Sequence, residues 1–317
     1  MTDILFVVHR YAPYPGGSEV NTQNMAEECQ RRGHNVTVLT HEHKGDLNGV
    51  SVTSDYQGML NKKWDLIIVH GGDVISQNVV HINADKIQSP VLYLLIKPSD
   101  SDICVEGLKK HRFLGYGTSM DVEHIKKFGM YEKARRIRYG IVQQNTIVSK
   151  NHVKNIRTTY VSAGGFWHHK AMTPLAKAFL DLDMIADLYL YGYGAPELAP
   201  KQEKNIQVLF GLPKEDVMNA IANADGYIMN SYEEGFGLVL LEAMMNKVPW
   251  FARDIAGAHD MRQFGTLYKD ESELIEILRN YKRDERKIED AYNYAMANHT
   301  IHDTVNDIED VLLETLK

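Results

Sequence analysis

Residues 232–249 read YEEGFGLVLLEAMMNKVP, and their pattern indicates the fold class of the whole chain. They follow a short apolar run, residues 227–229, that predicts a strand. Two glycines flank Phe236, so the backbone there can turn sharply and approach a ligand closely. Residues 238–246 contain no glycine or proline and favour a helix. The order strand, glycine turn, helix leaves free N–H groups at the turn, where phosphates bind most often.

Two acidic residues bracket this turn and helix. Glu234 precedes the first glycine, and Glu242 follows eight residues later in the predicted helix. Because part of that span is turn, both carboxylates can face one cleft. A carboxylate only accepts hydrogen bonds, which suits neighbouring sugar hydroxyls. A phosphate site between two such acids fits a sugar that is joined through a diphosphate to a ribose.

The run EGFGLVLLEAM, residues 234–244, resembles the E-x7-E signature of the retaining GT-B glycosyltransferases, which include glycogen synthases and bacterial mannosyltransferases. This resemblance implies an α/β protein with two Rossmann-like, doubly wound domains that face a cleft. It also implies that Glu234 is a catalytic residue at the donor sugar and that Glu242 binds the ribose. The backbone expected to meet the donor is that of Gly235, Phe236, Gly237 and Leu238. The alternative is an ordinary buried helix that carries a surface acid.

Composition indicates a globular protein without a membrane anchor. The chain has 317 residues, 44% hydrophobic and 24% charged, which is enough for two domains. Its net charge of −7 argues against general nucleic-acid binding. Cys29 and Cys104 form no disulfide framework and indicate a reducing compartment, so we expect a cytoplasmic protein. No run reaches transmembrane length, and the apolar run at residues 4–8 is too short for a signal peptide.

The first half of the chain predicts a doubly wound sheet. Residues 4–8 are typical of a buried parallel strand, and a loop with Gly16 and Gly17 follows. We expect Ser18 to cap the next helix and Gly33 to end it. The resemblance implies that Gly16 and Gly17 approach the donor phosphate and the acceptor. Taken alone, the glycine pair also fits an ordinary turn between a strand and a helix.

A histidine ends the next predicted strand of this half. Residues 65–69 form the apolar run, and His70 follows at its carboxyl end, before Gly71 and Gly72. Ligands of open α/β sheets bind beyond the carboxyl ends of strands. The resemblance implies that His70 is a catalytic residue that reaches the donor sugar. A single histidine in such a place is otherwise more often structural.

A run of basic residues bears on the acceptor. Its members are Lys126, Lys127, Lys133, Arg135, Arg136 and Arg138. Such a run can meet an anionic acceptor such as DNA or lipid headgroups, but it also fits a solvated surface. The acceptor therefore stays open. It can be a glycan, a lipid-linked glycan, a small molecule, or a modified base of phage DNA, because DNA glucosyltransferases share this architecture.

The second half carries the expected diphosphate site. Residues 158–163 predict a strand, and the resemblance implies that Gly164 and Lys170 after it contact the donor, with Lys170 as the catalytic cation on the diphosphate. The family usually has an arginine where this chain has Gly165, and a glycine where it has Ala171. One of two expected cations is therefore missing. The candidates to replace it are His168, His169, Arg10 and helix amides.

The resemblance also sets the expected domain limits. We expect an acceptor-side domain at residues 1–142, a nucleotide-sugar-binding domain at 143–300, and a C-terminal helix at 301–317 that packs back on the first domain. In the second domain, the loop with Leu212 is expected to receive the nucleotide base. Asn230 and Ser231 stand where the family usually has proline and serine.

No metal ion and no cofactor besides the donor are expected. The two Asp-x-Asp pairs, Asp100 with Asp102 and Asp181 with Asp183, are a short and common motif, and no zinc spacing is present. The sequence thus predicts a retaining, metal-independent transferase of a hexosyl or pentosyl group, with a UDP-sugar as the favoured donor. Two other functions stay open. One is a nucleotide-sugar-binding protein with little turnover, which the missing arginine would permit, and the other is a sugar-nucleotide epimerase.

Overall fold

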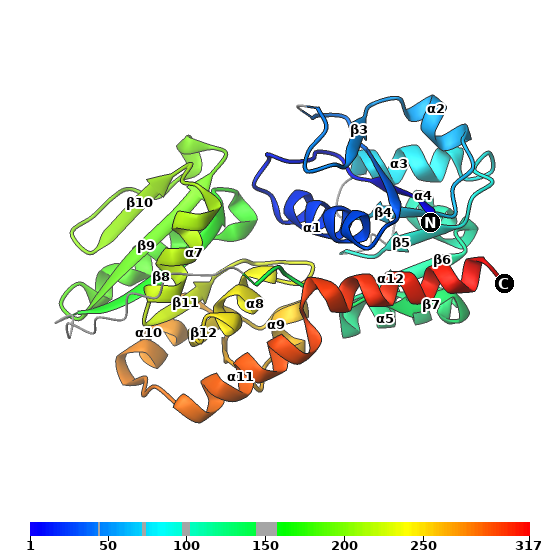
Figure 1. Cartoon of the computed structure of the whole chain (residues 1–317). Helices are drawn as coiled ribbons and strands as arrows, with labels where there is room; N and C mark the ends of the chain where they lie inside the picture. Colours follow the sequence, from blue (N-terminus) through cyan, green and yellow to red (C-terminus); the bar gives the residue numbers. More distant parts are fainter. Residues whose placement is uncertain (44, 72–73, 97–101, 144–156) are drawn as a thin grey trace. The chain divides into compact units, whose positions relative to one another are not determined.

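The computed structural model describes residues 1–43, 45–71, 74–96, 102–143 and 157–317 (Figure 1). Gly72 and Asp100 lie outside these ranges, as does most of the polar stretch after residue 142. Contacts divide the chain into two compact units, and each is described by itself. Unit 1 comprises Met1–Val142 and Asn298–Lys317, and unit 2 comprises Gln143–Ala297.

Unit 1 is built on a parallel sheet, as its apolar runs predict. The strand order is β3-β2-β1-β4-β5-β6-β7. The strands are β1 (Asp3–Val7), β2 (Asn35–Leu39), β3 (Ser51–Thr53), β4 (Leu66–His70), β5 (Val91–Leu94), β6 (Phe113–Tyr116) and β7 (Ala134–Arg136). The central strands are buried on both faces, which is why they read as continuous apolar runs rather than as alternating patterns.

Helices cover both faces of this sheet. They are α1 (Gly17–Arg31), α2 (Tyr56–Asn61), α3 (Val74–Asn83), α4 (Asp102–Lys110), α5 (Ser119–Lys127) and α12 (Ile301–Thr315), with a 3-10 turn at Tyr131–Lys133. Side chains of α1 and α12 form one core with the sheet, and side chains of α2 to α5 form the other. The arrangement is that of a doubly wound α/β domain.

The two ends of α1 differ in how well the sequence predicts them. The helix begins at Gly17, and no side chain caps it, so the expected cap at Ser18 is wrong. The Ser18 hydroxyl donates instead to the Glu19 carboxylate at 2.7 Å. The end at Gly33 is confirmed, because this glycine has a φ of +92° and the His34 N–H donates back to the Cys29 carbonyl at 3.2 Å.

Helix α12 joins unit 1 after the chain has completed unit 2 (Figure 1). The chain re-enters unit 1 beside residue 141, where the Ile141 N–H donates to the His299 carbonyl and the Ile301 N–H donates to the Ile141 carbonyl, both at 3.0 Å. The apolar side of α12 is then buried in the core that α1 forms with the sheet. Its members there are Ile301, Val305, Ile308, Val311 and Leu312.

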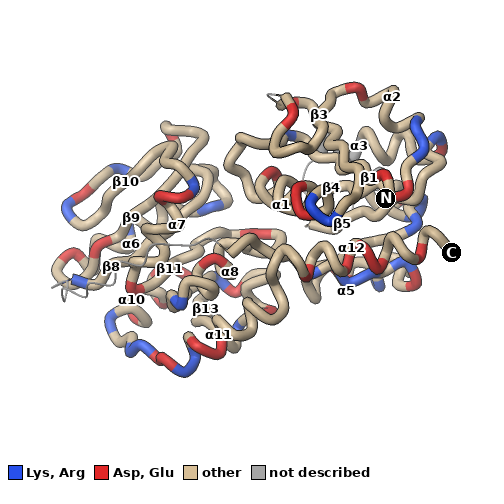
Figure 2. The backbone as a smooth tube through the Cα atoms, in the orientation of Figure 1, with Lys and Arg blue, Asp and Glu red and all other residues tan. Residues whose placement is uncertain are grey.

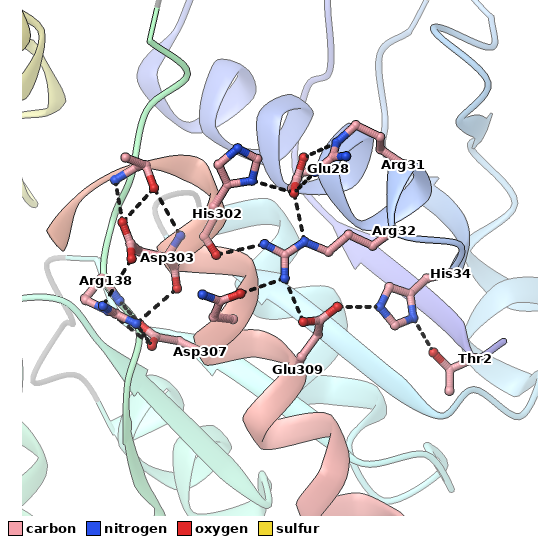
Figure 3. Close-up of polar contacts among 12 residues, drawn as sticks. Thr2, Glu28, Arg31, Arg32, His34, Arg138, His302, Asp303, Asp307 and Glu309 are labelled. Carbon is pink, nitrogen blue, oxygen red and sulfur yellow. Dashed lines mark hydrogen bonds and ion pairs between the residues drawn. The ribbon is translucent and has the colours of Figure 1, made fainter. Parts of the chain in front are cut away.

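Polar contacts also hold α12 against α1 (Figure 3). Glu28 of α1 is 6% exposed and accepts hydrogen bonds from Arg31, Arg32 and His302 at 2.7, 2.8 and 2.8 Å. Burial alone would raise the pKa of Glu28, but these three donors outweigh it and lower the pKa to about 2. Arg32 also donates to Glu309 of α12 at 2.7 Å. Breaking such a buried pair leaves a charge without its partner, so these contacts fix α12 in place.

Several residues of the basic run also bind acidic side chains of unit 1. Arg138 donates to Asp307 at 2.9 Å, and Arg135 donates to Glu314 at 2.8 Å, so both bind acids of α12. Lys126 forms an ion pair with Glu123 on its own helix at 3.1 Å. Basic and acidic positions accordingly occur together around α5 and α12 (Figure 2). These side chains stabilise unit 1 itself.

Unit 2 contains a second parallel sheet, with the order β10-β9-β8-β11-β12-β13. Its strands are β8 (Thr158–Gly165), β9 (Ala186–Tyr193), β10 (Ile206–Phe210), β11 (Gly226–Met229), β12 (Trp250–Arg253) and β13 (Thr266–Tyr268). Its helices are α6 (Met172–Phe179), α7 (Lys214–Asn223), α8 (Leu238–Met245), α9 (Ala256–Asp260), α10 (Glu271–Asn280) and α11 (Glu285–Asn298). Helices α6 and α10 share one core with the sheet. The prediction of an α/β protein with two doubly wound sheets is confirmed.

Within the described ranges, no helix combines the length and the apolar character that crossing a membrane requires.

Candidate active site

The strand, turn and helix predicted around Phe236 are present in unit 2. Strand β11 ends at Met229, and α8 begins at Leu238. Gly237 stands before the helix with a φ of +80°, a left-handed conformation that favours glycine. Gly237 is the N-cap residue and has no side chain with which to cap α8. The first N–H groups of this helix and the positive end of its dipole therefore form a site suited to an anion.

A second glycine, in α9, allows this turn to pack closely against it. Gly257 of α9 is buried, and a Cβ atom added to it would lie 1.9 Å from the Phe236 carbonyl oxygen. That oxygen belongs to the backbone and cannot swing aside. The turn between Glu234 and Leu238 can therefore hold its position only while residue 257 has no side chain.

We expect Gly257→Ala to lower the free energy of unfolding by about 1–3 kcal/mol, because the added methyl group overpacks a closed site. Gly17→Ala is the matched control for stability, since a Cβ at Gly17 has no atom within 4 Å. Calorimetric melting of both variants tests this. Equal melting temperatures for the two variants would contradict the contact between Gly257 and the turn.

Two of the predicted catalytic residues are in direct contact. Lys170 Nζ donates to Glu234 Oε1 at 2.5 Å, and the Ser231 hydroxyl donates to the same oxygen at 2.6 Å. Lys170 ends a 3-10 turn, His168–Lys170, that follows β8. The Tyr232 N–H donates to the His169 carbonyl at 2.8 Å and joins the two loops. Strands β8 and β11 are neighbours in the sheet, so their carboxyl ends bring these loops together.

The residue after Lys170, where the resemblance implies a glycine, has a backbone conformation that favours glycine. Ala171 has a φ of +50°, in the left-handed region. This conformation is held by Asn230, whose side-chain amide donates to the Ala171 carbonyl at 2.8 Å and to Glu271 at 2.9 Å. Tyr268 in turn donates its hydroxyl to Asn230 Oδ1 at 2.8 Å. A proline in place of Asn230 has no side-chain amide and makes none of these bonds. The support of Ala171 therefore depends on the asparagine that this chain has at position 230.

The second acid of the signature has a lysine partner that sequence reasoning missed. Glu242 is 7% exposed and forms an ion pair with Lys214, the first residue of α7. A nearly buried carboxylate requires such a partner or a ligand. Only the position of Lys214 at a predicted helix start could have signalled it, and most lysines at such positions are solvated.

A buried tyrosine hydroxyl senses the charge of both acids. Tyr227 of β11 hydrogen-bonds with the Ala163 backbone at 3.1 Å. Burial raises the pKa of Tyr227 above its usual range, and the charges of Glu242 and Glu234 raise this pKa further. The charges of both carboxylates therefore act on one buried hydroxyl.

The remaining predicted site residues of unit 2 lie around this group. Gly164 has a φ of +155°, and a Cβ there would lie 3.8 Å from the Lys170 side chain. Leu212 is 41% exposed and follows Gly211 in the loop that leads to Lys214. Unit 2 thus brings Gly164, Lys170 and Glu234 together, and Lys214, two residues after Leu212, joins the start of α7 to Glu242 of α8.

The other predicted site residues belong to unit 1. His70 ends β4 and is 4% exposed, and burial lowers its pKa to about 4. It is therefore neutral at physiological pH, and its Nδ1 atom has no hydrogen-bond partner among the described residues. Gly16 and Gly17 stand at the start of α1, where the Glu19 carboxylate occupies the space that a Cβ on Gly16 would need. Lys170 and Glu234, the two predicted catalytic residues in contact with each other, both belong to unit 2.

Among the described residues, no group of three or more histidine, cysteine, aspartate or glutamate side chains is placed to hold a metal ion. Asp181 lies in a short 3-10 turn, Leu180–Leu182, after α6.

Comparison with known proteins places this geometry in a family. Residues 146–296 match the family model described as glycosyl transferases group 1. HepE of Anabaena, solved with UDP and glucose, is 16% identical with a TM-score of 0.78, over 99% of this chain and 100% of that chain. WaaG, a glycosyltransferase involved in lipopolysaccharide biosynthesis, is 17% identical with a TM-score of 0.72, over 98% and 99% of the two chains.

A third solved structure has the same fold. Sucrose-phosphate synthase of Thermosynechococcus elongatus is 13% identical with a TM-score of 0.77, over 100% of this chain and 99% of that chain. No curated protein matches the chain in sequence. The predicted family and the predicted GT-B fold are confirmed by the family match and by these structures. Residues 146–296 therefore form a region of the glycosyl transferases group 1 family, and the chain as a whole has the GT-B fold.

Proposed function

We propose that this protein is a retaining glycosyltransferase that moves a hexosyl or pentosyl group from a nucleotide-diphosphate sugar, with a UDP-sugar as the first candidate. The observation that carries the proposal is the contact of Lys170 with Glu234 beside Gly164 and the uncapped start of α8. HepE, which has a similar fold, was solved with UDP and glucose, and this supports UDP as the nucleotide.

Each residue has a distinct task in this proposal. The diphosphate lies at the start of α8, where Lys170 and the amide N–H groups stabilise the negative charge that grows as the bond to the sugar breaks. Glu234 holds hydroxyls of the sugar, and Glu242 holds hydroxyls of the ribose. Without a donor, Lys170 and Glu234 neutralise each other. When the donor binds, Lys170 therefore contacts the diphosphate and Glu234 contacts the sugar, and these contacts replace the ion pair.

Unit 1 is proposed to supply the acceptor side. His70 reaches the donor sugar as a neutral hydrogen-bonding group, and Gly16 and Gly17 let the backbone approach the acceptor. A glycan or a lipid-linked glycan is the favoured acceptor, because WaaG acts in lipopolysaccharide biosynthesis. A modified DNA base is less favoured, since Arg135 and Arg138 are bound by acids of α12.

The test begins with a thermal-shift screen of nucleotide sugars, followed by mass spectrometry of products with candidate acceptors. A donor that raises the melting temperature and yields a glycosylated product with the anomeric configuration of the donor supports the proposal. Donor binding without hydrolysis or transfer would favour a nucleotide-sugar-binding protein instead. Conversion of the donor to an isomer, with no acceptor present, would favour an epimerase.

We expect full activity in an excess of EDTA, because Lys170 and the amides of α8 supply the positive charge that the leaving diphosphate requires. Release of the nucleoside diphosphate, measured with and without chelator, checks this. Activity that disappears with EDTA and returns with Mg²⁺ or Mn²⁺ would contradict it.

A further inference from the structure

An indole ring fills the place where the family's arginine would begin. A Cβ atom on Gly165 would lie 2.2 Å from Nε1 of Trp167, and a Cβ on Gly194 would lie 2.5 Å from its Cζ2. The ring therefore extends across two glycines, with its five-membered part at Gly165 and its six-membered part at Gly194. Both glycines stand at the carboxyl ends of neighbouring strands, β8 and β9.

The backbone of Gly165 does not itself require glycine. Its φ lies outside the left-handed region, unlike that of Gly194, which is +91°. The reason for glycine at position 165 is thus the space that Trp167 occupies. An arginine at position 165 and the indole of Trp167 would need the same space. The structure can therefore hold the arginine side chain or the indole ring there, but not both.

The indole is partly exposed. Trp167 is 39% exposed, whereas Trp64 and Trp250 are each 1% exposed. Phe210 and Leu212, at the end of the adjoining strand β10, are 43% and 41% exposed. Three large apolar side chains thus stand at the sheet edge where ligands of α/β folds bind. The ring extends from β8, which leads to Lys170, towards the loop that contains Leu212.

We propose that the indole of Trp167 stacks on the base of the donor nucleotide, and that this stacking replaces the affinity an arginine at position 165 would provide through the diphosphate. The proposal rests on the proposed function. An indole has no charge with which to hold a phosphate, but its planar face suits a planar base. With the diphosphate at Lys170, a ring that extends towards β10 lies on the path to the base.

Fluorescence tests the stacking directly, because Trp167 is the exposed one of three tryptophans. We expect UDP to quench the emission of the full-length protein and to protect it from acrylamide. Trp167→Leu should weaken UDP binding about 5–150-fold in calorimetry, while binding of inorganic pyrophosphate stays unchanged. Trp167→Phe, which keeps a ring, should retain most of the affinity and lose the quenching.

The outcomes separate this inference from the function on which it rests. If UDP binds the wild-type protein but Trp167→Leu binds it equally well, the stacking is wrong and the transferase proposal stands. If a change in emission persists in Trp167→Phe, another tryptophan reports it and the assignment to Trp167 fails. If neither UDP nor any nucleotide sugar binds the wild-type protein, both proposals are overturned.

A second experiment tests whether an arginine at position 165 and the indole of Trp167 exclude each other. We expect Gly165→Arg to lower the melting temperature and weaken UDP binding in the wild-type background, because the indole must leave its place. The same change in a Trp167→Gly background should be tolerated better, and pyrophosphate binding should strengthen there as the cation enters. Equal effects of Gly165→Arg in both backgrounds would overturn the steric exclusion.

Discussion

Replacing Lys170 by alanine is expected to lower kcat about 10²–10³-fold, the loss typical of removing one preorganised donor from a developing negative charge. Position 165 carries no cation, because a glycine stands there and the indole of Trp167 fills the space beside it, so we expect Lys170 to carry this charge with the amides of α8. The variant also leaves Glu234 with the Ser231 hydroxyl as its remaining donor in unit 2 among the described residues.

The matched control is Lys177→Ala, which removes an equal charge from an exposed position on α6. Steady-state kinetics with the identified donor, together with melting curves, separate catalysis from folding. We expect the control to keep its kcat. A Lys170→Ala enzyme with near-normal kcat would show that the diphosphate is neutralised elsewhere, and Arg10 and His168 would be the next residues to replace.

Glu242→Ala is expected to weaken nucleotide binding about 10–150-fold, which corresponds to the loss of roughly 1.5–3 kcal/mol from a hydrogen bond to a charged group. A nucleotide without ribose hydroxyls should bind the wild-type protein less tightly by a similar factor. It should bind the variant no less tightly than UDP does. Calorimetry with both nucleotides gives the four affinities of this cycle.

Lys214→Ala distinguishes a binding role of Glu242 from a structural one. If Glu242 binds the ribose, this variant keeps the carboxylate and should keep its affinity for UDP within a few-fold. If Glu242 serves only to pair with Lys214, the two variants should lose the same stability and both should bind UDP like the wild-type protein. That second pattern would rule out Glu242 as the ribose ligand.

Much of the fold could be predicted because burial on both faces leaves a visible pattern. The apolar runs at residues 4–8 and 65–69 correspond to β1 and β4, within one residue at each end. Gly33 could be predicted as a helix end because its left-handed conformation excludes most other residues. The start of α1 could not, since Ser18 forms its hydrogen bond with Glu19 rather than with the backbone.

The contacts of the site depend on distances that sequence spacing does not contain. Lys170 and Glu234 meet because β8 and β11 are neighbours in the sheet, although the two residues are far apart in the chain. The absence of an arginine at position 165 was visible in the sequence. That Trp167 fills its place was not, because the position of the indole depends on the turn after β8.

Helix α12 determines the order in which the protein can fold during synthesis. The core of unit 1 includes side chains of α12, whereas unit 2 is one continuous segment of the chain. At about 5–20 residues per second, roughly 10–30 s pass on the ribosome between residue 142 and residue 301. During that time the core that α1 forms with the sheet lacks the side chains of α12. Unit 2 is therefore the first to be able to complete its fold, although the ribosome makes it second.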